Sequence, residues 1–163
     1  MAYIHAMPDD LYDRDALAWS ERQAALLRRV ARGERVNDVD WDHVVEEIEG
    51  VGLSQLNAVH SYLRQMLAHL LKLHGWPDSD ACDHRRNEVA TFQVDAIARY
   101  APSMRQRIDL PRAYELAQRQ IAPMRLGDHA GLPAPASCPI TIDQLLTAAV
   151  ENLEAAFVSQ PSA

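Results

Sequence analysis

Apolar residues recur at helical spacing throughout residues 41–74, and this stripe is the strongest structural signal in the chain. When each residue is turned by about 100° around a helix axis, the apolar positions fall within one narrow sector. The pattern therefore predicts one long amphipathic helix at the centre of a helical domain, with its apolar side covered by other helices. The stripe consists of Trp41, Val45, Ile48, Gly52, Leu56, Val59, Leu63, Met66, Leu67, Leu70 and Leu73.

Two glycines interrupt this segment, and each costs a helix about 1 kcal/mol relative to alanine. The apolar phase nevertheless stays the same before and after Gly50 and Gly52. Gly52 also lies on the stripe, where its missing side chain would let another helix approach closely. A continuous helix that ends at Gly75 is therefore expected, and a break with Ser54 as a new N-cap is the alternative.

The rest of the chain predicts further helices, which are separated by glycine and proline. They are expected over residues 9–33, 79–100, 111–123 and 142–158. The last of them follows Thr141 and Gln144, which have the spacing of a capping box. No segment alternates with period two for long enough to form a strand, so residues 127–139 are expected to be irregular. The sequence thus predicts an all-α, single-domain bundle of four to six helices over residues 1–158, with a frayed tail at residues 159–163.

Composition narrows the functional classes. The chain has 163 residues, 48% apolar and 24% charged, which is the ordinary mix of a globular protein. Its net charge of −7 argues against broad binding of nucleic acids, which requires a strongly basic face. No window approaches the run of about 18 apolar residues that spans a membrane, and the start of the chain does not have the pattern of a signal peptide. We therefore expect a cytoplasmic protein with no membrane segment.

The charges are unevenly distributed along the chain. Residues 1–52 contain twelve acids and six arginines, a balance of −6, whereas residues 84–125 contain eight arginines and four acids, a balance of +4. Opposite charges that orient neighbouring helices are the simpler interpretation, and an arginine face for a phosphate-bearing partner is the alternative. The two cysteines, Cys82 and Cys138, are too few to be a disulfide framework in a chain of this size.

Histidines and glutamates on the long helix form a pool of possible metal ligands. His43 and Glu47 lie one turn apart, a spacing that can ligate a metal, although a solvated ion pair is the simpler interpretation. Imidazole with carboxylates suits zinc, manganese or iron, but the chain has no Glu-x-x-His pair and lacks the second histidine of the inverted zinc motif. No cofactor is therefore predicted, and a divalent metal is the alternative. The candidate residues are Glu46, Glu47, Glu49, His69, His43 and His60.

Four segments together resemble a known family. They are Leu11-Tyr12-Asp13-Arg14-Asp15 with Ala18-Trp19, Glu46-Glu47-Ile48-Glu49-Gly50-Val51-Gly52, His69-Leu70-Leu71-Lys72, and Cys138-Pro139 before a leucine-containing helix. Their order and spacing over residues 11–147 resemble the bacterial family catalogued as domain of unknown function 29. The resemblance implies a compact helical domain in the cytoplasm of a bacterium, and it brings no assigned activity. The acidic and His-Leu-Leu-Lys motifs of the family correspond here to Glu46, Glu47, Glu49, His69 and Lys72.

Three functional hypotheses follow. The incomplete catalytic motifs and the segregated charge favour a non-enzymatic helical module that binds another protein or itself. A divalent-metal-dependent enzyme with a His/Glu site on the central helix is the alternative. An anion or nucleic-acid binder that uses the arginine-rich residues 84–125 is a further alternative, in which the acidic total disfavours nucleic acid.

Overall fold

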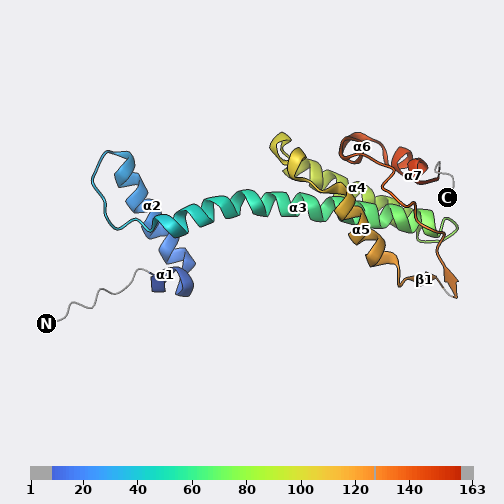
Figure 1. The fold of residues 1–163 in the computed structure, drawn as a ribbon, viewed down its shortest axis with the longest axis horizontal. Coiled ribbons are helices and arrows are strands. Elements are labelled where there is room, and N and C mark those ends of the chain that lie inside the picture. The colour runs from blue at the N-terminus through green and yellow to red at the C-terminus, as the bar shows by residue number, and fades with distance from the viewer. Residues whose placement is uncertain (1–8, 127, 159–163) are drawn as a thin grey trace. The chain divides into compact units, whose positions relative to one another are not determined.

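The long helix predicted from the apolar stripe is present and unbroken. In the computed structural model, which describes residues 9–126 and 128–158, α3 (Trp41–Gly75) is a single helix of 35 residues (Figure 1). It continues through Gly50 and Gly52, so the prediction of a continuous helix is confirmed. The described residues are helical apart from their connections and one short strand pair, which confirms the all-α fold. Neither α3 nor any other described helix combines the length and the hydrophobicity needed to cross a membrane.

The chain divides into two compact units, and the boundary between them falls inside α3. Unit 1 comprises Met1–Gly52, and unit 2 comprises Leu53–Ala163. The single domain expected over residues 1–158 stays a prediction, and the frayed tail expected at residues 159–163 lies outside the described residues.

Unit 1 combines α1 (Asp9–Arg14), α2 (Ala16–Ala31) and the first part of α3. The prediction of one helix over residues 9–33 is wrong, because the chain leaves the helical conformation at Asp15. The Asp15 side chain accepts a hydrogen bond from the backbone N–H of Ala18 at 3.0 Å. Asp15 therefore caps a new helix instead of continuing the first one.

A small core holds unit 1 together. Trp19 of α2 packs with Val39 and with Val44 of α3, and partly buried apolar side chains of α1 and α2 surround them. The side of α3 that carries Val44 is therefore the side that unit 1 covers.

The apolar stripe of α3 is buried only in its second part. From Leu56 onward its members are buried in unit 2. In unit 1, by contrast, Trp41, Val45 and Ile48 are 53%, 51% and 68% exposed, because the covered side is the adjacent one with Val44. The prediction that other helices cover the whole stripe is therefore wrong for unit 1.

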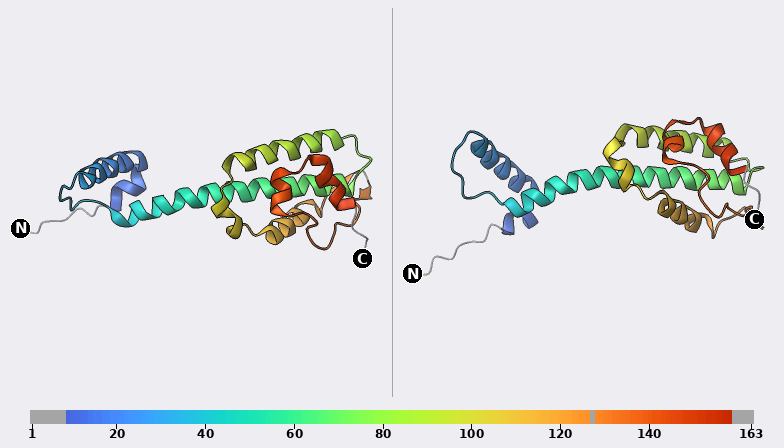
Figure 2. Two further views of the ribbon diagram at one scale, coloured as in Figure 1. Left: turned by 90° about the horizontal axis from the view of Figure 1, so that it is seen from above. Right: turned by 45° about the horizontal axis from the view of Figure 1, so that its top comes forward.

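Unit 2 is built around the second part of α3. Four α-helices and a 3-10 helix, η1, lie along this part of α3 in both views of Figure 2. The predicted helices over residues 79–100 and 111–123 are confirmed to within a few residues at each end. The elements are α4 (Cys82–Arg99), η1 (Pro102–Arg107), α5 (Leu110–Ile121), α6 (Ile142–Thr147) and α7 (Val150–Val158).

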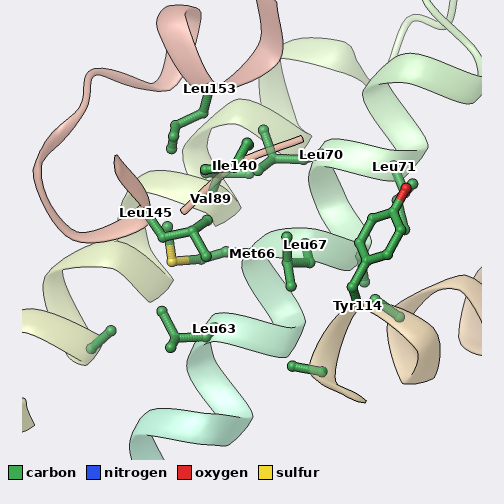
Figure 3. Close-up of a cluster of buried hydrophobic side chains, with 14 of the residues drawn as sticks. Leu63, Met66, Leu67, Leu70, Leu71, Val89, Tyr114, Ile140, Leu145 and Leu153 are labelled. Carbon is green, nitrogen blue, oxygen red and sulfur yellow. The ribbon is translucent and has the colours of Figure 1, made fainter. Parts of the chain in front are cut away.

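The core of unit 2 forms where α3 meets these helices. Leu63, Met66, Leu67 and Leu70 of α3 are fully buried. Burying each such side chain contributes about 1.5–3 kcal/mol, so the packing around α3 supplies much of the stability of unit 2. Figure 3 shows these residues together with side chains from the surrounding elements, namely Val89 of α4, Tyr114 of α5, Leu145 of α6 and Leu153 of α7.

The prediction of one helix over residues 142–158 is wrong, because two helices occupy this segment. The capping box is confirmed, since Thr141 and Gln144 each accept a hydrogen bond from the backbone of the other. The first helix, α6, ends at Ala148, whose backbone is extended. The side-chain amide of Gln93 on α4 donates to two backbone carbonyls at this end, at 2.8 and 2.9 Å. It thereby satisfies carbonyl groups that the break leaves without helical partners.

One pair of short strands lies in and beside the segment predicted to be irregular. β1 (Arg125–Leu126) and β2 (His129–Ala130) pair in antiparallel fashion, with Leu126 opposite His129. Two residues are too few to show the alternation typical of a strand, so the pattern of the sequence does not predict this pair.

Candidate functional site

The six predicted metal ligands do not come together in one site. In unit 2, His60 Nε2 lies 3.3 Å from the carbonyl oxygen of Arg107 rather than beside a carboxylate. In the part of the chain that the structure describes, no three His, Cys, Asp or Glu side chains are placed to hold a metal ion. Unit 1 contains His43, Glu46, Glu47 and Glu49, and unit 2 contains His60 and His69.

His43 takes part in a polar network at the start of α3. Its Nδ1 lies 2.8 Å from Oδ2 of Asp40, and the same oxygen accepts a hydrogen bond from Trp19 Nε1 at 3.0 Å. Burial opposes ionisation of Asp40, but the hydrogen bonds from His43 and Trp19 outweigh it and hold the pKa of this carboxyl below its usual value. The prediction of a solvated His43 is wrong, because the ring is half-buried within this network.

Glu47 is bound by α1. The hydroxyl of Tyr12 donates to Glu47 Oε1 at 2.6 Å, and the Tyr12 ring stacks on His43 with ring centroids 4.1 Å apart. The hydrogen bond to Glu47, with a smaller contribution from burial, raises the pKa of Tyr12 to about 12. The phenol therefore stays protonated at neutral pH. The three glutamates of the acidic motif, Glu46, Glu47 and Glu49, are all exposed, and Glu47 joins α1 to α3.

Beside this network, α3 carries an open apolar surface, the unit 1 stripe, which is formed by Trp41, Val45, Ile48 and Gly52. A Cβ atom added at Gly52 would have no neighbour within 4 Å. The prediction that another helix approaches closely at this glycine is therefore wrong for residues 9–126 and 128–158, none of which covers the stripe. At about 100° per residue, three acids lie on one flank of the stripe, about 80–140° around the helix. They are Asp42, Glu46 and Glu49.

A cluster of charged side chains lies between α3 and α4 in unit 2. Arg85 of α4 is buried, and its Nη1 donates to the carbonyl oxygen of Lys72 on α3 at 3.2 Å. Burial, followed by the nearby Arg85, lowers the pKa of Lys72, and Glu88 opposes this shift. His69, one turn before Lys72, lies against Phe92 with ring centroids 5.8 Å apart, and its Nδ1 is buried without a hydrogen-bond partner. The His-Leu-Leu-Lys motif thus supplies two members of this cluster.

A pocket of about 360 Å³ lies between α5 and residues 136–140, with a mostly apolar lining. Two polar side chains at its wall are already engaged, because Tyr114 Oη and Gln118 Nε2 both donate to the carbonyl oxygen of Pro135, at 2.8 and 3.0 Å. Burial raises the pKa of the Cys138 thiol, which makes it a weak nucleophile. Sequence reasoning missed this pocket, and the Cys-Pro motif is the only signal that marks it.

The arginine-rich residues 84–125 do not form one uniformly basic face. Several of these arginines form ion pairs. The N–O distance is 2.8 Å in the pair of Arg86 and 2.6 Å in the pairs of Arg112 and Arg119, so part of the positive charge is offset locally. This weakens the case for a general electrostatic surface for nucleic acid. The pairs are Arg86 with Glu154, Arg105 with Asp143, and Arg112 and Arg119 with Glu115.

Comparison with known families accounts for most of the chain. The family described as "Domain of unknown function DUF29" matches residues 11–150. The chain belongs to the DUF29 family. The resemblance seen in the sequence motifs is thereby confirmed, while comparison with curated proteins finds no match.

This DUF29 chain is also similar to a solved structure. A crystal structure from Rhodospirillum rubrum, described as an alpha-helical protein of unknown function, is 27% identical to it with a TM-score of 0.62. The match covers 88% of this chain and 95% of that chain. The likeness supports the helical fold, and neither description names an activity, so a function has to be argued from the surfaces of the chain itself.

The half-buried imidazole of His69 makes the stability of this DUF29 chain depend on pH. Burial lowers the pKa of His69 from its ordinary value of 6.5 to about 4, and Lys72 adds to the shift. The neutral ring therefore contributes stability that is complete above pH 6.5 and is lost as the pH falls toward 4. After allowance for solvent screening of a half-buried group, we expect the loss to be on the order of 1 kcal/mol.

Urea unfolding at about pH 7.5 and about pH 4.5 measures this loss, with His69→Gln as the matched variant. Glutamine does not titrate, so the variant should lose less stability than the wild type between the two pH values. Equal losses in the two proteins would show that other groups of the chain are responsible.

Proposed function

We propose that this DUF29 chain is a non-enzymatic protein-interaction module that binds through the unit 1 stripe. Its partner is an amphipathic helix whose apolar face is bordered by lysine or arginine. The proposal is supported by one observation above the others, namely that Trp41, Val45 and Ile48 are half-exposed or more on one side of a long helix.

An exposed apolar stripe of this kind is unusual on a chain that has a core of its own. Contiguous apolar patches of a few hundred Å² on soluble proteins generally mark interaction sites. The residues of the stripe are spaced i, i+4, i+7 and i+11. Apolar side chains with this spacing lie on one face of a helix and form the contacts between two packed helices. Gly52 leaves open space at the end of the stripe, where a partner backbone can approach closely.

The charge around the stripe determines the chemistry of the partner. Asp42, Glu46 and Glu49 border the stripe, and residues 1–52 carry twelve acids against six arginines. A helix with basic borders is therefore attracted and oriented by this surface. Because these acids lie on one flank only, an antiparallel pair of stripes would place acids against acids, and a parallel pair would place the acids against the side of α3 that unit 1 covers. We therefore favour a different protein as the partner.

We also place the module in the cytoplasm. Cys82 and Cys138 are both free thiols. Free thiols are typical of a reducing compartment.

A designed peptide tests the proposal. The probe is a fluorescent helical peptide with leucine at positions i, i+4 and i+7 and with lysine on both borders, and its affinity is measured by fluorescence anisotropy. Ile48→Asp should weaken binding at least about tenfold, because it places a charge at the centre of the apolar contact. Val94→Asp makes the same change in charge at an exposed apolar position of α4 and should leave the affinity unchanged.

Two controls make this result decisive. A peptide with the same leucines but glutamate borders should bind weakly, and equal binding of both peptides would contradict the proposed charge recognition. Light scattering on the free chain should show a monomer. A dimer that Ile48→Asp dissociates would instead make a second copy the occupant of the stripe and would overturn the choice of partner.

A further inference from the structure

We propose that Lys72 and Arg85 of unit 2 bind a phosphate group between α3 and α4. The site uses neither the unit 1 stripe nor the apolar pocket beside α5, so it does not depend on the proposed protein partner. One cation comes from each of two neighbouring helices, and a hydrogen bond from the Arg85 guanidinium to the main-chain carbonyl of Lys72 brings the two residues together.

The main chain of α3 fixes the guanidinium of Arg85 in place. Only 7% of Arg85 is exposed, and its Nη1 donates to the carbonyl oxygen of Lys72 at 3.2 Å. This bond helps to complete the last turn of α3, but it uses only one of the five N–H donors of a guanidinium. Among the described residues, neither Arg85 nor Lys72 forms a side-chain ion pair. The helix-capping role of Arg85 therefore leaves most of its donors available.

The two cations disfavour each other in this half-buried position. Burial lowers the pKa of Lys72, and the neighbouring Arg85 lowers it further. Glu88 offsets only part of this repulsion. Its Oε1 also lies 3.9 Å from Nε2 of His84. A bound dianion would neutralise both cations, whereas a carboxylate ligand would neutralise one of them.

The surrounding donors suit the shape of a phosphate group. The planar fork of an arginine can hold two phosphate oxygens, and a lysine adds a compact charge at a third. His69 lies one turn from Lys72, and its Nδ1 is buried without a partner. Arg85 also lies near the N-terminus of α4, where the helix dipole favours an anion and opposes the negative end of the α3 dipole beside Lys72.

The amino-acid composition offers a selective test, because Lys72 is the only lysine in the sequence. A neutral acetylating reagent should therefore modify Lys72 and the terminal amine, and mass spectrometry distinguishes the two. Inorganic phosphate should slow acetylation of Lys72 relative to chloride at the same ionic strength. The terminal amine, measured in the same sample, should react at the same rate in both salts.

A pair of matched variants tests the electrostatic basis of the site. Glu88→Gln removes the acid that competes for the two cations, and it should tighten phosphate binding about five-fold in calorimetry. Asp95→Asn removes the same charge about two turns further along α4 and should change the affinity much less. Lys72→Met should abolish phosphate binding, with circular dichroism showing that the helices persist.

Equal acetylation of Lys72 in phosphate and in chloride would overturn the proposal. Identical phosphate affinity of Glu88→Gln and Asp95→Asn would also overturn it, because the effect would then be one of net charge. Phenyl phosphate identifies the source of the group, since binding tighter than that of inorganic phosphate indicates a phosphate carried by a larger molecule. Equal binding of the two probes indicates the free anion, and both results are consistent with the site.

Discussion

Replacing Leu70 with alanine is expected to destabilise unit 2 by about 3 kcal/mol. Leu70 is fully buried in the second part of α3, where it packs with side chains of the surrounding helices (Figure 3). The substitution removes apolar contact and leaves a cavity that the neighbouring helices fill only in part. Native-state hydrogen exchange resolved by residue measures the change, because it reports on the amides of unit 2 separately from those of unit 1.

Ile48→Ala is the matched control for this prediction. Ile48 lies on the same stripe of the same helix, but it is exposed in unit 1. Alanine is also the better helix former, so the substitution should change stability by no more than about 0.5 kcal/mol. Comparable losses for Leu70→Ala and Ile48→Ala would mean that both parts of the stripe are buried, which would contradict the structure.

Replacing Asp40 with alanine is expected to destabilise unit 1 by between about 2 and 3 kcal/mol. Its carboxylate accepts the hydrogen bond of Trp19 Nε1 and lies against Nδ1 of His43. Without it, the indole N–H of a buried tryptophan has lost its acceptor, and the half-buried imidazole loses its negative partner. The small core of unit 1 has few other contacts to compensate for this loss.

Hydrogen exchange of the α2 amides measures the effect, and Asp38→Ala is the control. Asp38 is exposed two residues earlier in the chain, so the same substitution there should cost no more than about 0.5 kcal/mol. If Asp40→Ala left the protection of α2 unchanged, the polar network would not be what holds α2 against α3.

The elements that depend on local sequence were predictable. The constant phase of the apolar positions predicted that α3 continues through Gly50 and Gly52, and the spacing of Thr141 and Gln144 predicted the start of α6. The end of α6 was not predictable, because the hydrogen bonds that satisfy it come from Gln93 on another helix. Local pattern therefore indicated where helices form, while distant contacts decide where some of them end.

For the candidate binding surfaces, too, the local sequence indicated only part of the result. Helical spacing groups Ile48 with Leu70 on one stripe, but it carries no information on which part of the helix other elements cover. The break at Asp15 and the packing of Val44 determine that unit 1 covers the adjacent side instead. The pairing of Lys72 with Arg85 likewise arises only when two helices pack together, since no motif joins the two residues in the sequence.

The claim that the unit 1 stripe binds a basic amphipathic helix is tested most directly by mapping the contact on the full chain. The measurement is a titration of the isotope-labelled protein with the lysine-bordered peptide, followed by amide and indole NMR resonances. We expect the largest shifts at Trp41, Val45, Ile48 and Gly52, including the indole N–H of Trp41. Shifts confined to other residues, with these four unmoved at saturation, would contradict it.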